Sequence, residues 1–198
     1  MSVVFNYKLI AYLNNNLQFT SMRIYIDKVF QKEAKEYAII SKSFTSKRHD
    51  FYEGGLSDKQ RTLFEGKLGE KAIKQFFIDH KIKFKEDQSS HDEADFYDFI
   101  VYDLKGNELK VEVKTRTKIS YIRTLESVEQ MKNNPKDIYF SVKLYDTKPF
   151  CVDVIGYGLK EDFLSINRIE NKGDLDNYVL YDKELKNPKL IIPTLQKI

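Results

Sequence analysis

The 198-residue sequence has little of what builds disulfides, zinc sites or membrane spans. Its one cysteine, Cys151, excludes an internal disulfide and a cysteine-based zinc site, and we expect it to be a small buried residue on a strand. The apolar runs are far shorter than the roughly 20 residues of a membrane-spanning helix. The first residues lack a basic segment, an apolar core and a cleavage site, so we expect no secretory signal and place the protein in the cytoplasm.

Several catalytic signatures are also missing. The 3 histidines do not have the spacing of a zinc site or a histidine-based nuclease. No phosphate-binding G-x-x-x-x-G-K-[ST], no dinucleotide-binding G-x-G-x-x-G and no G-x-S-x-G nucleophile motif occurs. The sequence therefore gives no support for nucleotide hydrolysis, dinucleotide binding or acyl transfer.

The composition is that of a protein with a real core, at 41% hydrophobic and 32% charged residues. A net charge of +3 is too small to indicate a nucleic-acid partner by itself. Local patches say more, because 41–49 and 113–123 hold many cations and almost no acids. Such patches are often solvated faces, so each alone is weak evidence.

Apolar periodicity predicts an ordered series of elements from residue 57 onward. A capping-box pattern at 57–60 precedes an amphipathic helix that runs to about His80. The apolar positions of this helix, expected to face the core, are Leu63, Phe64, Leu68, Ala72, Ile73, Phe76 and Phe77. A short strand at 81–87, a polar loop at 87–95, a β-hairpin around Gly106, a helix at 121–134 and two strands at 137–146 and 149–158 follow. This order predicts an α/β fold with a mixed β-sheet flanked by helices. We expect an N-terminal extension at 1–56, a core at 57–160 and a C-terminal extension at 161–198.

The register of the hairpin decides where its charged side chains point. A three-residue loop at 105–107 matches the apolar pattern of both strands and puts Phe99 opposite Val113 and Val101 opposite Val111. A two-residue loop would instead place the acidic residues of the two strands on opposite faces. We therefore prefer the three-residue loop.

In that register three charged side chains share the other face of the hairpin. Asp98 is expected opposite Lys114 and diagonal to Glu112, about 7–8 Å away at the backbone. Two converging carboxylates make a hard oxygen site that suits Mg²⁺, and an ammonium beside them could position water or offset negative charge. An ordinary amphipathic hairpin with solvated charges is the alternative, because E-x-K alone is common on strands. Asp95 is a competing candidate for the metal-binding aspartate.

The segment DFIVYDLKGNELKVEVKT resembles the core motif of the PD-(D/E)xK nuclease superfamily, which includes many restriction endonucleases and Holliday-junction resolvases. In that family an aspartate opens one strand, (D/E)-x-K follows on the next, and a G-E-x-x-A pattern often lies on the preceding helix. Gly69, Glu70 and Ala72 match that pattern, while Tyr97 replaces the proline. The resemblance covers roughly 57–157 and implies a restriction-endonuclease-like fold.

The resemblance also implies roles for particular residues. Asp98 and Glu112 would bind Mg²⁺ (or Mn²⁺), with the Val113 carbonyl as a further ligand, and Lys114 would assist the attacking water. Glu70 would support the site; its alternative is a surface glutamate that pairs with a lysine such as Lys74 at i+4.

Four cationic residues are candidate contacts to nucleic acid. Arg116 and Lys118 follow the E-x-K segment, where the family often holds the scissile phosphate. Lys47 and Arg48 form a basic arm before the helix. Surface roles are the alternative for all of them.

The sequence thus predicts a Mg²⁺-dependent endodeoxyribonuclease that hydrolyses DNA phosphodiester bonds with a metal-activated water. A homodimer is plausible, since cutting both strands of a duplex usually needs two centres. The alternatives are a structure-selective nuclease resembling a junction resolvase, and a non-catalytic DNA-binding or assembly protein that retains the fold. A chance match of the hairpin in an unrelated domain is the remaining alternative.

Overall fold

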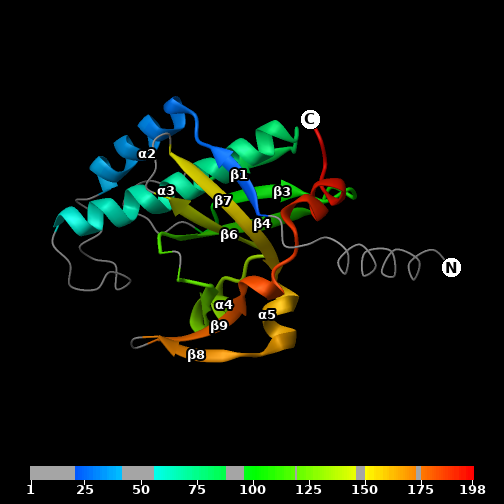
Figure 1. The fold of residues 1–198 in the computed structure, drawn as a ribbon. Coiled ribbons are helices and arrows are strands. Elements are labelled where there is room, and N and C mark those ends of the chain that lie inside the picture. The colour runs from blue at the N-terminus through cyan, green and yellow to red at the C-terminus, as the bar shows by residue number, and fades with distance from the viewer. Residues whose placement is uncertain (1–20, 42–55, 88–95, 119, 146–149, 173–174) are drawn as a thin grey trace.

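The computed structural model describes residues 21–41, 56–87, 96–118, 120–145, 150–172 and 175–198, and it is a mixed α/β protein (Figure 1). A six-stranded mixed sheet has the strand order β1-β7-β6-β4-β3-β2, and a three-stranded sheet has the order β5-β9-β8. The elements in chain order are β1 (Met22–Tyr25), α2 (Lys28–Ser41), α3 (Leu56–Asp79), β2 (Phe84–Glu86), β3 (Phe99–Tyr102), β4 (Glu108–Arg116), β5 (Arg123–Ser127), α4 (Val128–Asn133), β6 (Ile138–Tyr145), β7 (Cys151–Leu159), α5 (Lys160–Ile166), β8 (Ile169–Lys172) and β9 (Leu175–Tyr181).

Helix α3 covers one face of the large sheet and buries its apolar side against the strands (Figure 1). The predicted core positions Leu68, Ile73, Phe76 and Phe77 are all fully buried. Phe77 lies at the centre of an aromatic cluster, with its ring centroid 5.5 Å from that of Phe99 and 5.9 Å from that of Phe140. Burying one such side chain contributes about 1.5–3 kcal/mol, so this layer fixes how α3 sits on the sheet.

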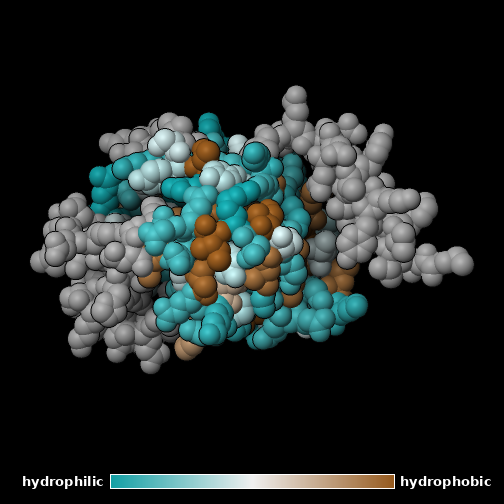
Figure 2. All heavy atoms as spheres, turned by 90° about the horizontal axis from the view of Figure 1, so that it is seen from below, coloured by the Kyte–Doolittle hydropathy of each residue, from teal (hydrophilic) through white to brown (hydrophobic). Residues whose placement is uncertain are grey.

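The opposite face of the large sheet is covered by α4, α5 and the small sheet. A second apolar cluster joins Tyr139 of β6 to Met131 of α4, Phe163 of α5 and Leu180 of β9. The outer surface of this layer is mixed: Figure 2, which views the molecule from below, shows apolar atoms gathered near the middle with polar atoms around them. Exposed apolar side chains of α5, β8 and β9 are Leu164, Ile166, Ile169 and Leu175.

Both ends of the described chain lie against the large sheet. β1 pairs with β7 at one edge, and α2 packs on α3. At the C-terminal end, Leu195 is buried and the Gln196 N–H donates to the Tyr102 carbonyl at 2.8 Å. Cys151 is buried on β7, as the sequence predicted. No helix within the described ranges is both long and apolar enough to cross a membrane.

The predicted hairpin forms, but its predicted register is wrong by two residues. Phe99 pairs with Val111, and the loop spans 103–107. Asp103 leaves the strand because its carboxylate accepts the N–H groups of Lys105 and Asn107, each at 2.8 Å, in an Asx-type turn. A shift of two residues keeps every side chain on its predicted face, and continuing the register by one step sets residue 98 level with residue 112.

The predicted helix at 121–134 is correct only in its second half. Residues 123–127 form β5, which pairs with the distant strand β9 through partners such as Leu125 and Val179. Ser127 ends the strand and caps α4, since its hydroxyl accepts the Gln130 N–H at 3.0 Å. Long-range pairing therefore overrides the local helical pattern before Ser127.

Candidate functional site

The candidate site lies where β4 extends beyond its neighbour β3. β3 pairs only with 108–111, and no described strand pairs with 112–116 on that side. On its other side, β4 stays paired in parallel with β6 through to Arg116. The second half of β4 is therefore held from one side, while its other edge has no strand partner among the described residues; we call it the open edge.

Asp98 is attached to this open edge through both its backbone and its side chain. Its N–H donates to the Val111 carbonyl at 2.9 Å, and its Oδ2 accepts the Val113 N–H at 2.6 Å. These two contacts flank Glu112. The predicted metal-binding aspartate and glutamate thus come together at one end of the hairpin, and Val113, predicted to supply a carbonyl, uses its N–H to orient Asp98.

Glu112 and Lys114 project together toward the layer that contains α4 and β5. The Lys114 ammonium lies 3.0 Å from Glu112 Oε1 and 2.7 Å from Glu126 Oε2. Lys136, which is almost fully buried, places its Nζ 3.7 Å from Glu112 Oε2. Glu112 is therefore held between two cations, and Lys114 between two carboxylates.

The sequence interpretation missed Glu126 and Lys136. Glu126 lies on β5 with a side chain that is 0% exposed. It sits within a segment predicted to be helical, and Lys136 follows a proline in an apparent loop. No local motif points to either residue, because only the packing of β5 and α4 onto the sheet brings them to β4.

Glu70 reaches the site because α3 passes unusually close to β4. A Cβ added at Gly69 would collide with the Thr115 hydroxyl and would touch a methyl of Val142. The absence of a side chain at Gly69 is therefore what allows the close approach. Glu70 pairs with Lys67 on the same helix.

The alternative partner of Glu70, Lys74, is engaged elsewhere: its Nζ lies 2.6 Å from Glu86. The alternative, an ion pair with a lysine of the same helix, is therefore met in kind, by Lys67 and not by Lys74. Glu70 also lines the pocket beside the second half of β4.

The charges of the site are unequally compensated. Burial, followed by repulsion from Glu70 and Glu112, raises the pKa of Asp98 well above its ordinary value. Burial also acts to raise the pKa of Glu112, but Lys114 and Lys136 outweigh it and lower that pKa. Asp98 is thus a carboxyl group whose ionised form the protein stabilises poorly.

The pKa values of Lys114 and Glu126 are likewise set by burial and by neighbouring charges that oppose it. Burial opposes the charge on Lys114, but Glu112 and Glu126 raise the pKa of its ammonium above the ordinary value. Burial raises the pKa of Glu126, although Lys114 acts in the opposite direction. Lys114 therefore stays charged, and its charge depends on the two carboxylates around it.

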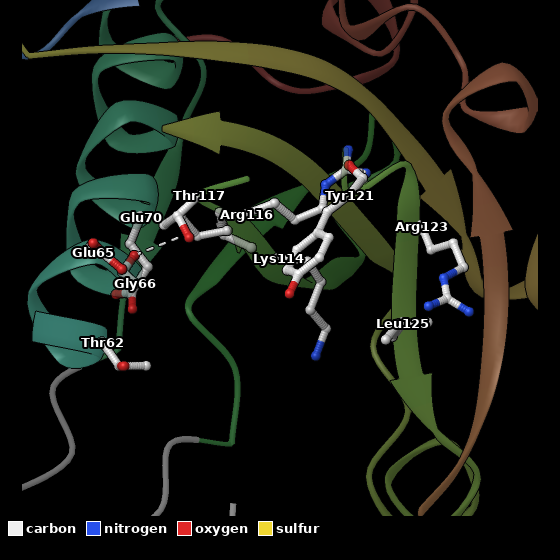
Figure 3. A pocket seen from close by; sticks show the side chains of 12 residues that line it. Thr62, Glu65, Gly66, Glu70, Lys114, Arg116, Thr117, Tyr121, Arg123 and Leu125 are labelled. Atoms are coloured by element: carbon white, nitrogen blue, oxygen red, sulfur yellow. Dashed lines mark hydrogen bonds between the residues drawn. The ribbon is translucent and has the colours of Figure 1, made fainter. Parts of the chain in front are cut away.

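A pocket of about 420 Å³ opens beside these residues, between α3, the end of β4, and β5 (Figure 3). It includes Glu70, Val113 and Lys114, whereas Asp98 and Glu112 lie outside its lining. The pocket and the carboxylates are therefore adjacent parts of one site. Its other lining residues are Thr62, Glu65, Gly66, Thr115, Arg116, Thr117, Tyr121, Arg123 and Leu125.

The predicted nucleic-acid contacts are placed differently from one another. Arg116 lines the pocket but is buried: its guanidinium pairs with Asp182 at 2.7 Å and donates to the Ser141 hydroxyl and the Tyr121 carbonyl. Lys118 is exposed, with its Nζ 5.3 Å from the centre of the Tyr121 ring. Lys47 and Arg48, like the competing Asp95, fall outside the described residues.

Within the described part of the chain, no group of three or more His, Cys, Asp or Glu side chains is arranged to hold a metal ion. Glu70 and Glu112 are turned toward lysines, so the three carboxylates do not converge on one point. Comparisons with protein-family models, curated proteins and solved structures found no significant match to the chain. The function must therefore be argued from the chemistry of the site.

Proposed function

We propose that the protein is a Mg²⁺-dependent endodeoxyribonuclease of the PD-(D/E)xK kind, hydrolysing DNA phosphodiester bonds. The observation that carries the proposal is the attachment of Asp98 to both neighbours of Glu112, with the Lys114 ammonium 3.0 Å from Glu112. An aspartate, a glutamate and a lysine thereby meet at one open strand edge. This is the arrangement that the sequence motif implies.

The order of elements supports the same proposal. A long helix carrying Gly69 and Glu70 precedes the hairpin, and Asp98 lies directly before its first strand, with Glu112 and Lys114 on its second. Gly69 has a specific purpose in this arrangement, because it lets the helix approach β4 at Thr115. A chance E-x-K on a strand would not require a helix to come so close.

The residues present fit a magnesium ion. Mg²⁺ is usually held by one or two carboxylates, with water and substrate phosphate completing its shell, so Asp98 and Glu112 suffice without a third acidic ligand. The raised pKa of Asp98 indicates uncompensated negative charge that a cation would offset. When bound, Mg²⁺ would supply a water of lowered pKa and would neutralise charge on the phosphate.

The remaining side chains orient the reactants. The Lys114 ammonium would donate to the attacking water or to a phosphate oxygen, and Glu126 behind it keeps it charged and in place. Glu70, at the rim of the pocket, would accept a hydrogen bond from a water beside the metal. Water would attack the phosphorus in line with the departing oxygen.

The direct test is incubation of plasmid, linear and branched DNA with the protein in Mg²⁺, Mn²⁺ or EDTA. We expect cleavage with either metal and none in EDTA. Lys114→Ala should lose at least about 100-fold in rate, the size of effect that one electrostatic donor supplies. Lys132→Ala, which removes an exposed lysine of α4, is the matched control and should cleave like the wild type.

Metal binding separates a nuclease from a protein that only binds DNA. The wild type should bind Mn²⁺ in calorimetry, and Asp98→Ala should abolish that binding. DNA affinity without metal binding and without cleavage would favour the non-catalytic alternative. Cleavage that persists unchanged in Lys114→Ala would overturn the proposed site.

A further inference from the structure

The pocket beside the carboxylates extends well past the residues that the proposed reaction uses. Its far wall is formed by Tyr121 and by β5 residues Arg123 and Leu125 (Figure 3). Its volume of about 420 Å³ is in the range of pockets that hold a small ligand. A pocket of this size beside Lys114 is large enough to bind a ligand.

Tyr121 is an exposed aromatic residue on a fixed backbone. The residue is 42% exposed, yet its carbonyl accepts a hydrogen bond from Arg116 Nη1 at 2.9 Å. Its N–H donates to the Lys118 carbonyl at 3.0 Å. Because these two hydrogen bonds fix the backbone of Tyr121, the residue loses little conformational freedom when a flat ligand stacks on its exposed ring.

Arg116 supports the wall of the pocket through its hydrogen bond to the Tyr121 backbone. Its guanidinium is anchored by Asp182 on one side and by the Ser141 hydroxyl on the other, at 2.7 Å and 2.6 Å. It has little freedom to reach out to a phosphate. Its contact with the Tyr121 backbone makes it a positioning residue for the aromatic wall.

A cation beside Tyr121 favours a flat ligand that carries negative charge. Lys118 lies near the ring, and Lys114 faces the same pocket while paired with Glu112 and Glu126. The acidic residues of the lining are likewise paired with cations, Glu65 with Arg61 and Glu70 with Lys67. A ligand with an aromatic body and a negative group fits such walls, and a nucleotide has both.

We propose that this pocket takes one unpaired nucleotide of a nucleic-acid strand, with its base stacked on Tyr121 and its phosphate toward Lys114 and Lys118. A base within a duplex could enter only by leaving its stack, which costs a few kcal/mol and is least costly where the base is already unpaired. The protein would therefore prefer single strands and duplexes with an unpaired nucleotide over a fully paired duplex. The position of the phosphate near the metal rests on the proposed function, but the binding preference does not require cleavage.

Fluorescence anisotropy in EDTA tests the preference without cleavage. The probes are a fluorescein-labelled single strand, the matching duplex, and that duplex with one extra unpaired nucleotide. We expect Tyr121→Ala to weaken binding of the single strand and the bulged duplex roughly 5- to 150-fold, the range for loss of one base–aromatic stack. Binding of the matched duplex should change less than about twofold, and Tyr121→Phe should behave like the wild type because it keeps the ring.

The matched control is Tyr25→Ala, which removes an exposed tyrosine from β1 at the far end of the strand order. It should leave binding of all three probes unchanged. A single strand with 2-aminopurine at the unpaired position provides a measurement that needs no variant. Stacking on Tyr121 should change its fluorescence on binding, and a spectrum unchanged at saturation would contradict the proposal.

The outcomes separate this inference from the proposed function. Equal affinity for all three probes, or an equal loss for all three in Tyr121→Ala, overturns the unpaired-nucleotide pocket while metal-dependent cleavage can still stand. A selective loss in Tyr121→Ala without any metal-dependent cleavage keeps the pocket and removes the nuclease. A wild type that binds none of the probes overturns the pocket, while cleavage in Mg²⁺ still decides the proposed function.

Discussion

The two faces of β4 are held in contrasting ways. On one face, Val111 and Val113 pack with Phe77 and its aromatic neighbours beneath α3, where the side chains have no charge to compensate. On the other, Glu112 and Lys114 are surrounded by Glu126 and Lys136, and each buried charge depends on its partner. The first face gains stability from buried apolar area, whereas the second gains little net stability and holds the residues of the proposed site.

The contrast has a measurable consequence. Apolar packing does not change with protonation, so variants on the α3 face should lose the same stability at every pH. Variants on the charged face should lose amounts that depend on pH, because buried carboxylates can take up a proton when a cation is removed.

The largest expected loss is on the apolar face. Phe77→Ala removes a fully buried ring that contacts Phe76, Phe84, Phe99 and Phe140. It should lower the free energy of unfolding by about 3–5 kcal/mol, measured by urea denaturation. The loss should be the same at acid and neutral pH. Ile78→Ala, one position along and 44% exposed, is the matched control and should cost under about 1 kcal/mol.

A slightly smaller loss is expected on the charged face. Lys114→Met leaves Glu126 fully buried without its cation and should cost about 3 kcal/mol at neutral pH. The pKa of Glu126 is already raised, and removing Lys114 raises it further, so the carboxyl becomes protonated as the pH falls. The cost should therefore shrink toward acid pH.

The double variant Lys114→Met with Glu126→Leu sharpens that result. Replacing both partners by apolar side chains should recover most of the stability, since neither buried charge then lacks its partner. A cost for Lys114→Met that is constant with pH, or one that the second change does not reduce, would mean that the pair does not hold this face together.

The apolar face of β4 and the helix that covers it could be predicted from local sequence patterns. The spacing of Leu68, Ile73, Phe76 and Phe77 predicted α3 and its buried side, because a helix and its own apolar stripe depend only on nearby residues. The alternation in the hairpin likewise predicted which side chains of β4 face the core. The predicted register of the hairpin was wrong because the Asp103 carboxylate accepts backbone N–H groups of the loop and closes a turn there.

The charged face could be predicted only in part. Asp98, Glu112 and Lys114 lie within one hairpin, so sequence proximity brought them together. Glu126 and Lys136 depend on β5 pairing with β9 some 50 residues later, for example Leu125 with Val179, and such pairing leaves no local mark. The burial of Arg116 and its ion pair could not be predicted for the same reason, because its partner Asp182 is remote in the sequence.

The close approach of α3 to β4 should depend on the absence of a side chain at Gly69. Gly69→Ala places a methyl group where the Thr115 hydroxyl and a Val142 methyl lie, so α3 must shift away from the sheet. We expect a loss of about 1–3 kcal/mol in unfolding free energy, together with reduced cleavage because Glu70 moves with the helix.

Gly66, three positions earlier in the same helix, is the matched control for that change. An added Cβ meets nothing within 4 Å there. Gly66→Ala should therefore stabilise the helix by about 0.5–1 kcal/mol, since alanine is the better helix former. Similar effects from the two substitutions would show that Gly69 is not a contact point.

The smallest expected effect concerns Asp98 in the metal-free protein. Its folded-state pKa is raised, so the proton is bound more tightly in the folded state than in the unfolded chain. Its contribution to stability is complete below the unfolded pKa of about 4 and is lost as the pH rises through the folded pKa. Asp98→Asn removes this loss and should stabilise the metal-free protein at pH 7 by roughly 0.5–1 kcal/mol, the size of one screened charge pair.

Added metal should reverse which protein is the more stable, the wild type or Asp98→Asn. If the proposed site binds Mn²⁺, the melting temperature of the wild type should rise with increasing metal concentration, while that of Asp98→Asn should respond weakly. Asp79→Asn, at the exposed end of α3, controls for the loss of one negative charge and should match the wild type in both conditions. If Asp98→Asn destabilises the metal-free protein at pH 7, then the negative charge of Asp98 is itself stabilising, since asparagine keeps an oxygen that can accept the Val113 N–H. The charged face of β4 would then resemble the apolar one in being built for stability.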